Sequence, residues 1–356
     1  MNKGRRIQNL RQQFGGRNID AILVSQPENR YYLSGFSGSA GYLLITEQNA
    51  LLATDFRYVE QAKGQSPDYE VVRVTGELTK WLPEVVSGFR LKRLGFEAEH
   101  TAFAIYQKLT DIIEEMEFQF GLVPVAGLVE SLREVKEPEE IELISRAAGM
   151  ADAVMDRVED VVQPGMTELA AAWEIESCLR QNGSDHLPFN IIVASGPNAA
   201  LPHAVPSSRV INPGEPVVID IGARVDGYTS DLSRTICLGT PDDNFSRAYR
   251  AVLAAQGRAL ELIRAEMTGS EADGLARAVL AEAGYGDAFG HSLGHGVGLA
   301  THEKPHLGPG SADRLADGMV FTVEPGIYLA GWGGVRIEDM AVMENGKLRV
   351  ISRSRK

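Results

Sequence analysis

Short apolar runs alternate with helix-like segments over the first third of the chain. Three runs rich in Ala, Ile, Leu and Val have the length of buried strands, namely 21–24, 41–45 and 50–54. The last two flank a polar turn at Glu47-Gln48-Asn49. Hydrophobic positions recur at helical spacing over 5–16, 56–63 and 101–116. This alternation predicts an α/β domain over residues 1–125.

A charged stretch over residues 132–140 separates this region from a longer one. Pro138 suits the first turn of a helix, so we expect an amphipathic helix from Pro138 to about Val162, ending before Pro164-Gly165. Thr167 is a suitable N-cap for a second helix over 168–181. The remainder is strand-rich, with one more helical pair at about 244–266 and 271–283. We therefore expect a second domain over residues 131–356 and an α+β chain overall.

One pattern in the second region occurs twice. A turn, an apolar strand-like run and an acidic residue end at Asp220, and the same series ends about a hundred residues later at Glu324. A second acid follows each time, Asp231 eleven residues on and Glu338 fourteen residues on. The repeat indicates a duplicated half-domain whose two hairpins face each other.

Composition excludes several classes of protein. The chain has 356 residues, 44% of them hydrophobic, and a net charge of −13 without a long basic run, so nucleic acid is not an expected partner. Cys178 and Cys237 have no CxxC spacing, which is typical of reduced core thiols. The basic N-terminus is not followed by an apolar stretch, and no run approaches the length of a membrane span. We expect a cytoplasmic protein without a membrane partner.

The repeated acids indicate a metal site. A buried strand that ends in an ionised carboxylate is unfavourable unless the charge is paired or bound to metal. If each pair of strands returns on itself, then four carboxylates converge, and their repulsion would amount to several kcal/mol. Two divalent cations would balance these four charges, which belong to Asp220, Asp231, Glu324 and Glu338.

His295 is the best candidate for a fifth ligand, because the glycines on either side of it allow close approach of the backbone. One imidazole and four carboxylates form a hard, oxygen-rich set that suits Mn²⁺ and tolerates Co²⁺ or Zn²⁺. Two such ions about 3.5–4 Å apart can share and acidify a water, and this bridging hydroxide would attack an amide carbonyl.

Two other motifs fit known hydrolases poorly. Residues 302–306 match the HExxH zinc-peptidase pattern, which works only on a helix, and Pro305 lies inside it. Residues 290–294 match the GxSxG nucleophile elbow, but the last histidine of the chain, His306, follows too soon for that fold.

At these residues the chain resembles the proline-specific metallopeptidases with the pita-bread fold, namely Xaa-Pro aminopeptidase and Xaa-Pro dipeptidase. The resemblance covers almost the whole chain and implies a pseudo-twofold catalytic domain after a smaller N-terminal domain. Its ligand order Asp, Asp, His, Glu, Glu is complete, in Val218-Ile219-Asp220-Ile221-Gly222, Thr229-Ser230-Asp231, Gly294-His295-Gly296, Glu324-Pro325-Gly326 and Arg336-Ile337-Glu338-Asp339.

The resemblance also implies roles for single residues. The five ligands would hold two ions, with Asp231 and Glu338 bridging both and Glu324 also accepting the proton of the attacking water. His203 would contact substrate and the tetrahedral intermediate, and His302 would lie beside the leaving group. The remaining matches are Arg336, which would orient a carboxylate, and two weaker substrate-binding assignments, His291 and Tyr328.

We therefore expect an aminopeptidase that hydrolyses the N-terminal Xaa-Pro bond of peptides whose second residue is proline. The alternative is a dipeptidase that acts on Xaa-Pro alone. A pita-bread binding protein without catalysis is a third possibility, but such proteins typically lose metal ligands, and none is missing here. Family resemblance favours a homodimer.

Overall fold

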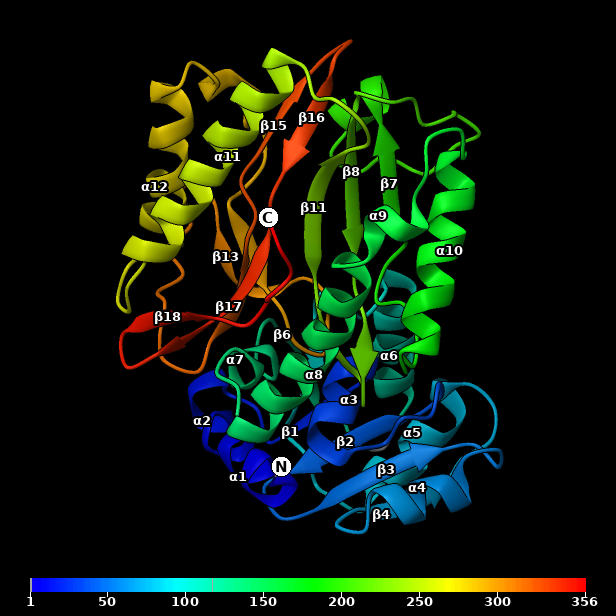
Figure 1. The fold of residues 1–356 in the computed structure, drawn as a ribbon. Coiled ribbons are helices and arrows are strands. Elements are labelled where there is room, and N and C mark those ends of the chain that lie inside the picture. The colour runs from blue at the N-terminus through cyan, green and yellow to red at the C-terminus, as the bar shows by residue number, and fades with distance from the viewer. Residues whose placement is uncertain (1, 117) are drawn as a thin grey trace. The chain divides into compact units, whose positions relative to one another are not determined.

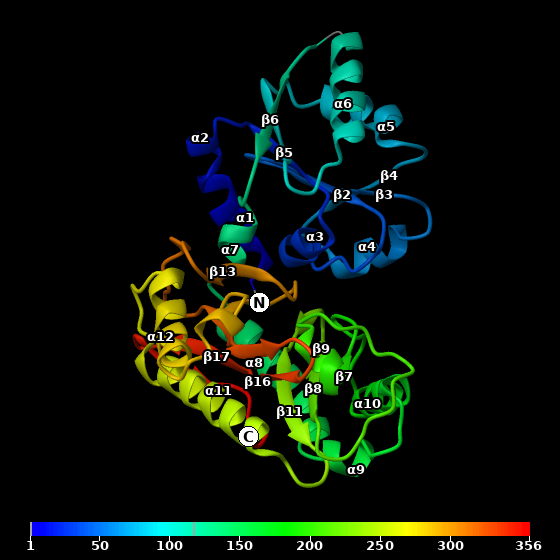
Figure 2. The same cartoon turned by 90° about the horizontal axis from the view of Figure 1, so that it is seen from above.

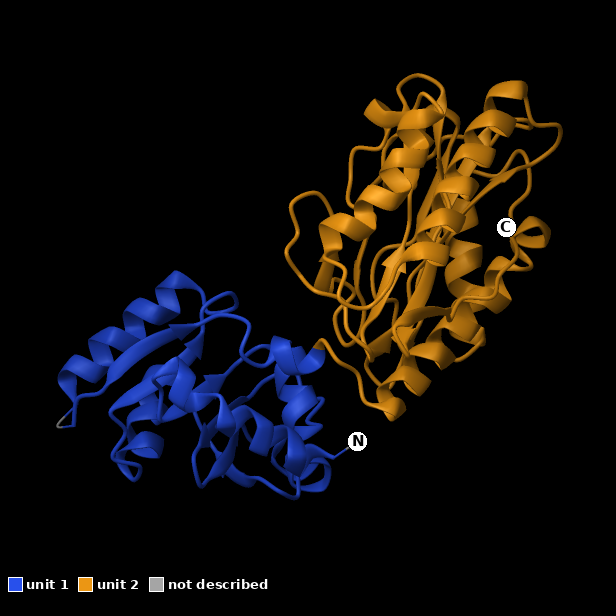
Figure 3. Cartoon of the chain, turned by 90° about the vertical axis from the view of Figure 1, so that its left-hand side faces the viewer, with its two compact units in different colours: residues 1–133 blue, residues 134–356 orange. Residues whose placement is uncertain are grey.

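A computed structural model describes residues 2–116 and 118–356, which form two units, residues up to Arg133 and residues from Glu134 onward (Figures 1 and 3). The helices of the first unit are α1 Lys3–Gln12, α2 Phe14–Arg17, α3 Pro27–Ser34, α4 Val59–Gln65, α5 Leu78–Ser87, α6 Phe103–Glu115 and α7 Glu130–Arg133. Its strands are β1 Ala21–Val24, β2 Tyr42–Thr46, β3 Ala50–Thr54, β4 Glu70–Arg73, β5 Arg93–Glu97 and β6 Gly121–Val125. Within the described part of the chain, no helix has the length and apolar character that a membrane span requires.

The first unit is built on one mixed sheet in the order β4-β3-β2-β1-β5-β6, with helices on both of its sides (Figure 2). All four residues of β1 are buried, as in a central strand that is covered on both faces. Leu82 of α5 and Leu109 of α6 pack with Leu23 and Leu44 on one of these faces. The expected strands at 21–24, 41–45 and 50–54 therefore form the middle of an α/β sheet.

The second unit contains four long helices and several small sheets (Figure 1). Its helices are α8 Pro138–Met155, α9 Val158–Val161, α10 Glu168–Gln181, α11 Asp243–Leu262 and α12 Gly269–Glu282, with 3-10 turns η1 Gly196–Ala200 and η2 Gly286–Ala288. Its strands are β7 Ile192–Ser195, β8 Pro216–Ile221, β9 Arg224–Val225, β10 Tyr228–Thr229, β11 Leu232–Cys237, β12 Gly294–Gly296, β13 Glu303–Leu307, β14 Val320–Val323, β15 Gly326–Leu329, β16 Gly333–Arg336, β17 Asp339–Glu344 and β18 Lys347–Val350.

Local sequence signals explain most of these helix boundaries. Pro138 occupies the first turn of α8, and Glu137 and Glu140 form a reciprocal capping box there. The Thr167 side chain accepts a hydrogen bond from Ala170 N and caps α10, as expected. The helix expected to run continuously to Val162 instead ends at Met155, because the backbone leaves helical geometry at Arg157 (φ −111°) before α9 begins.

The repeat in the sequence corresponds to two similar halves of this unit. In the first, β8 and β11 pair antiparallel and the short hairpin β9–β10 lies between them in the chain. In the second, β14 and β17 pair antiparallel with the hairpin β15–β16 between them. Each half is preceded by two long helices, α8 and α10 or α11 and α12. The expected pseudo-twofold architecture is confirmed, although each repeated pair of strands encloses an additional hairpin.

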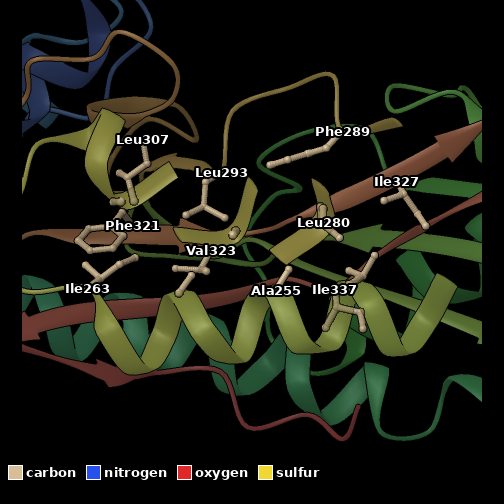
Figure 4. Close-up of a cluster of buried hydrophobic side chains, with 14 of the residues drawn as sticks. Ala255, Ile263, Leu280, Phe289, Leu293, Leu307, Phe321, Val323, Ile327 and Ile337 are labelled. Atoms are coloured by element: carbon tan, nitrogen blue, oxygen red, sulfur yellow. The ribbon is translucent and has the colours of Figure 1, made fainter. Parts of the chain in front are cut away.

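A hydrophobic core holds the second half together. Ala255 of α11 and Ile263, which directly follows that helix, pack with Phe321 and Val323 of β14, and Leu280 of α12 lies in the same cluster (Figure 4). These side chains are fully buried. Packing of the helices against β14 therefore determines where Glu324, the next residue of the chain, can lie.

We expect Leu280→Ala to lower the free energy of unfolding of the full chain by about 2–5 kcal/mol, because it leaves a cavity in this core. Urea unfolding of purified protein measures the change. The matched control is Leu169→Ala on α10, where the leucine is 55% exposed and the expected change is within about 0.5 kcal/mol. Equal effects of the two substitutions would contradict the assignment of Leu280 to the core.

Candidate metal centre

Two aspartates come from the first half of the repeat. Asp220 lies on β8 between the fully buried Ile219 and Ile221, and Asp231 directly precedes the partner strand β11. The register pairs Ile221 with Leu232, so the two strands bring both acids to the same end of the sheet. Ligand oxygens of Asp220, Asp231 and Glu338 lie within 4.8 Å of one another.

Two glutamates come from the second half. Glu324 follows β14, and Glu338 lies between β16 and β17. Glu338 N donates to Ser233 O on β11 at 3.1 Å, which joins the second half to the first. Thr322 Oγ1 donates to Glu324 Oε1 at 3.1 Å and orients that carboxylate. All four predicted acids therefore face one small volume.

His295 reaches the same volume from β12. Its Nε2 is 3.3 Å from Glu324 Oε1 and 3.6 Å from Asp231 Oδ2. Its Nδ1 is 3.1 Å from Gly296 O, and only a protonated Nδ1 can donate to that carbonyl, so Nε2 keeps a free lone pair. A Cβ on Gly294 would lie 2.0 Å from Thr322 O, which shows why glycine is required beside this histidine.

The electrostatics of the cluster favour a bound cation. Burial, followed by the charges of neighbouring carboxylates, raises the pKa of Asp231 and of Glu338 well above their usual range. Burial likewise raises the pKa of Glu324 to about 8. Burial and then His302 lower the pKa of His295 to about 3, so its contacts with the acids are those of a neutral imidazole rather than ion pairs.

Two buried oxygens of the cluster have no hydrogen-bond partner among the described residues, Asp220 Oδ1 and Glu338 Oε1. An unpaired buried carboxylate oxygen is unfavourable, and a divalent cation would satisfy both atoms. The donors are carboxylate oxygens and one imidazole nitrogen, the set that hard or borderline divalent ions prefer. The residues present therefore fit a metal centre.

Arg336 lies beside this cluster and contacts Asp220. Its side chain is buried and donates from Nη2 to Asp220 Oδ2 at 2.7 Å and from Nε to Ser233 Oγ at 2.8 Å. Nη1 donates to Tyr328 OH and to Pro202 O, at 3.0 and 3.1 Å. The guanidinium thus holds Asp220 in one orientation.

His291 is linked to the centre through Tyr328. Its Nδ1 is 2.8 Å from Ser292 O and its Nε2 is 3.0 Å from Tyr328 OH. Because Tyr328 OH accepts from Arg336, its own proton is available to His291 Nε2. Burial lowers the pKa of His291 to about 4, which agrees with a neutral ring that accepts this proton.

Two further predicted histidines, His203 and His302, lie near the ligand set. The rings of His302 and His295 are 4.0 Å apart between centroids. Burial and then the charge of His203 lower the pKa of His302, so these two histidines are close enough to interact. His203 and His302 are both exposed and can meet a substrate.

The HExxH match lies on β13, an extended strand, so it lacks the helix that a zinc-peptidase motif requires.

Three residues that support the ligands were not predicted from the sequence. They are Thr322, Ser233 and Met340, whose Sδ is 3.1 Å from Asp231 N. One signal was available, since Thr322 is a polar residue in an apolar strand two positions before Glu324, which places both on the same face.

Comparison with known proteins agrees with this geometry. The family model described as metallopeptidase family M24 matches residues 142–345, and the creatinase/prolidase N-terminal domain matches residues 6–135. The chain is 41% identical to a solved structure of an Xaa-Pro dipeptidase from Bacillus anthracis, with a TM-score of 0.95 and coverage of 100% of this chain and 99% of that one. It is 38% identical to an Xaa-Pro dipeptidase from Pyrococcus horikoshii over 95% of this chain and 94% of the relative.

A third similar protein has a different name. The structure of an X-Pro aminopeptidase from Thermotoga maritima is 35% identical, with a TM-score of 0.90 and coverage of 98% of each chain. The matches span nearly the full length of each relative. The chain therefore belongs to metallopeptidase family M24 and carries the creatinase/prolidase N-terminal domain.

Proposed function

We propose that this chain is an Xaa-Pro dipeptidase that hydrolyses dipeptides with a C-terminal proline. The sequence led us to prefer an Xaa-Pro aminopeptidase and to keep the dipeptidase as the alternative. The names of relatives favour that alternative, since the proteins from B. anthracis and P. horikoshii, 41% and 38% identical, are called Xaa-Pro dipeptidases. The X-Pro aminopeptidase of T. maritima keeps the aminopeptidase as a second candidate.

The observation that carries the proposal is the convergence of four carboxylates and one neutral imidazole on one buried volume. We assign two divalent ions to it, held by Asp220, Asp231, His295, Glu324 and Glu338. When bound, the ions would supply an acidified water as the nucleophile for the amide carbonyl. In this assignment Asp231 and Glu338 would serve both ions, as the family resemblance implies.

The other residues act on protons and on the substrate. Glu324, a carboxylate of the assigned ligand set, would accept the proton of the attacking water. His203 and His302 would donate hydrogen bonds to the oxyanion and to the departing proline nitrogen. That nitrogen belongs to a tertiary amide and must gain a proton to leave, so a nearby donor is needed. The free N-terminus of the substrate would bind near Asp220.

We expect the metal-loaded protein to hydrolyse Xaa-Pro with a kcat/KM about 10–100-fold higher than that for Xaa-Pro-Yaa. A dipeptidase recognises the carboxylate of proline, and hydrogen bonds to a charged group contribute about 1.5–3 kcal/mol. The matched control is the amide Xaa-Pro-NH₂, which has the size of the dipeptide without its negative charge. Equal kcat/KM values for all three substrates would support the aminopeptidase instead.

Manganese as the native metal, a homodimer and a cytoplasmic location stay predictions. Stripping the protein with a chelator and adding back Mn²⁺, Co²⁺ and Zn²⁺ separately, with metal analysis of each preparation, would identify the activating ion.

A further inference from the structure

The loop that carries His203 is held at both ends by one buried carboxylate. The loop covers residues 196–207, starting directly after β7. Ser195 precedes it and Ser207 ends it, and both contact Glu168, the first residue of α10. Glu168 is fully buried, and it belongs to neither the ligand set nor its immediate partners.

Glu168 accepts hydrogen bonds from three polar residues of the loop ends. Its Oε1 accepts from Ser195 N and Ser195 Oγ, each at 2.8 Å. Its Oε2 accepts from Ser207 N at 3.1 Å and from Ser207 Oγ at 2.7 Å. Asn198 Nδ2 lies between the two oxygens, at 3.2 and 3.1 Å. The carboxylate therefore joins positions that are twelve residues apart in the chain.

An ion pair between Arg209 and Glu215 reinforces this arrangement. Arg209 Nη1 donates to Ser195 Oγ, and the guanidinium binds both oxygens of Glu215 at 2.6 Å. Because Arg209 occupies the acceptor side of the Ser195 hydroxyl, the hydroxyl proton points to Glu168. Every donor around Glu168 is thus directed at a carboxylate, which only accepts.

Apolar packing contributes less to the position of the loop. Leu201 and Val205, which flank His203 on either side, are 58% and 79% exposed. Only the small side chains of Ala199 and Ala204 join a buried cluster, with strands β7 and β8. Between its ends the loop makes one polar contact with the centre, from Arg336 Nη1 to Pro202 O. The side chain of Glu168 therefore bonds to both ends of the loop, and backbone bonds from Leu169 N to Ser207 O at 3.1 Å and from Glu168 N to Arg209 O at 3.0 Å add to the restraint at the second end.

We infer that Glu168 is a positioning residue that holds the His203 loop in place beside the metal centre. It acts through the loop and contacts neither substrate nor metal. The inference rests on the proposed function for the role of His203, whereas the restraint on the loop itself does not depend on that function.

Glu168→Gln tests the inference in the full-length, metal-loaded protein. The amide keeps the size of the side chain but presents an NH₂ group to donors, so the contacts at one end of the loop are lost. We expect faster amide hydrogen exchange over residues 196–207, unchanged metal content, and a kcat/KM for Xaa-Pro about 100-fold lower, the effect of a misplacement near 1 Å. Ser207→Ala, which removes one donor and keeps the charge, should give a smaller change in the same direction.

A double-mutant cycle separates positioning from general destabilisation. If Glu168 acts through His203, Glu168→Gln should lower the activity of a His203→Ala protein by no more than about twofold. The matched control is Glu97→Gln in the first unit. Glu97 is also buried and accepts hydrogen bonds from Ser25 N, Ser25 Oγ, Gln26 N and Asn29 Nδ2, all of which belong to the first unit.

Unchanged exchange over residues 196–207 in both Glu168→Gln and Ser207→Ala would overturn the inference, as would fully additive effects in the cycle. Equal exchange in Glu168→Gln and Glu97→Gln would overturn it as well. Hydrogen exchange needs no substrate. If the wild-type protein fails to cleave proline dipeptides, the proposed function is refuted, but the exchange measurement still tests whether Glu168 restrains the loop.

Discussion

Glu324→Gln should lower kcat/KM for an Xaa-Pro dipeptide by at least about 10³-fold, the upper part of the range for loss of a general base. Glu324 combines two properties that the amide lacks, a negative oxygen for a cation and a basic oxygen that can accept a proton. The substitution is nearly isosteric, so the contact with Thr322 Oγ1 can persist and the fold should be retained. Steady-state kinetics on preparations of known metal content measures the loss.

The control for this variant is Glu344→Gln. Glu344 lies on β17 of the same sheet, but its carboxylate is exposed and pairs with Arg349. Its removal should leave kcat/KM within about twofold of wild type, since exposed ion pairs contribute little. A Glu324→Gln enzyme that retains a tenth or more of wild-type activity with its metal bound would rule out the role assigned to Glu324.

The acids of the centre could be predicted because their local sequence conflicts with ordinary folding. Asp220 follows three apolar residues on a strand that had to be buried, and the pattern recurs at Glu324. Such a conflict indicates function. The structure places both acids at the expected ends of β8 and β14, although the hairpins β9–β10 and β15–β16 that precede the second acids were not expected.

The polar groups that orient the centre could not be predicted in the same way. Glu168 looks like an ordinary acid in the first turn of a helix, where the dipole favours it. Its partners Ser195 and Ser207 lie 27 and 39 positions away, so only the folded chain brings them together. Contacts of this kind depend on tertiary packing, which the pattern of a single segment does not contain.

Some elements were missed because tertiary contacts override local preference. Residues Arg93–Glu97 form strand β5 between β1 and β6, yet the segment carries a charge at each end and a glycine in the middle. A Cβ on Gly95 would lie 3.0 Å from Ile19 and 3.3 Å from Ala21 O, so the close approach of the neighbouring strand favours glycine. The early end of α8 at Met155 is a similar case, since neither glycine nor proline marks it.

Metal removal should make the stability of the protein depend steeply on pH. The pKa values of Asp231, Glu324 and Glu338 are raised in the folded protein by burial first and by neighbouring carboxylates. Between the usual carboxyl range and pH 8 the folded state therefore binds more protons than the unfolded state, and the free energy of unfolding must fall as pH rises. We expect the Tm of the chelator-treated protein to decrease from pH 5 to pH 8. Thermal unfolding of that protein at several pH values measures this decrease.

Adding Mn²⁺ should reverse this trend, because the cation binds the ionised carboxylates and releases their protons. At a metal concentration 1,000 times Kd the stabilisation is about 4 kcal/mol, or roughly 8–16 °C in Tm for a unit of this size. Proton release can be read by calorimetry in buffers of different ionisation enthalpy. In Asp220→Asn, which weakens the site while leaving the cores intact, the Mn²⁺-induced rise in Tm should be much smaller. Equal rises in wild type and Asp220→Asn, or no proton release at pH 7, would show that the cation binds elsewhere and that these acids do not form the metal centre.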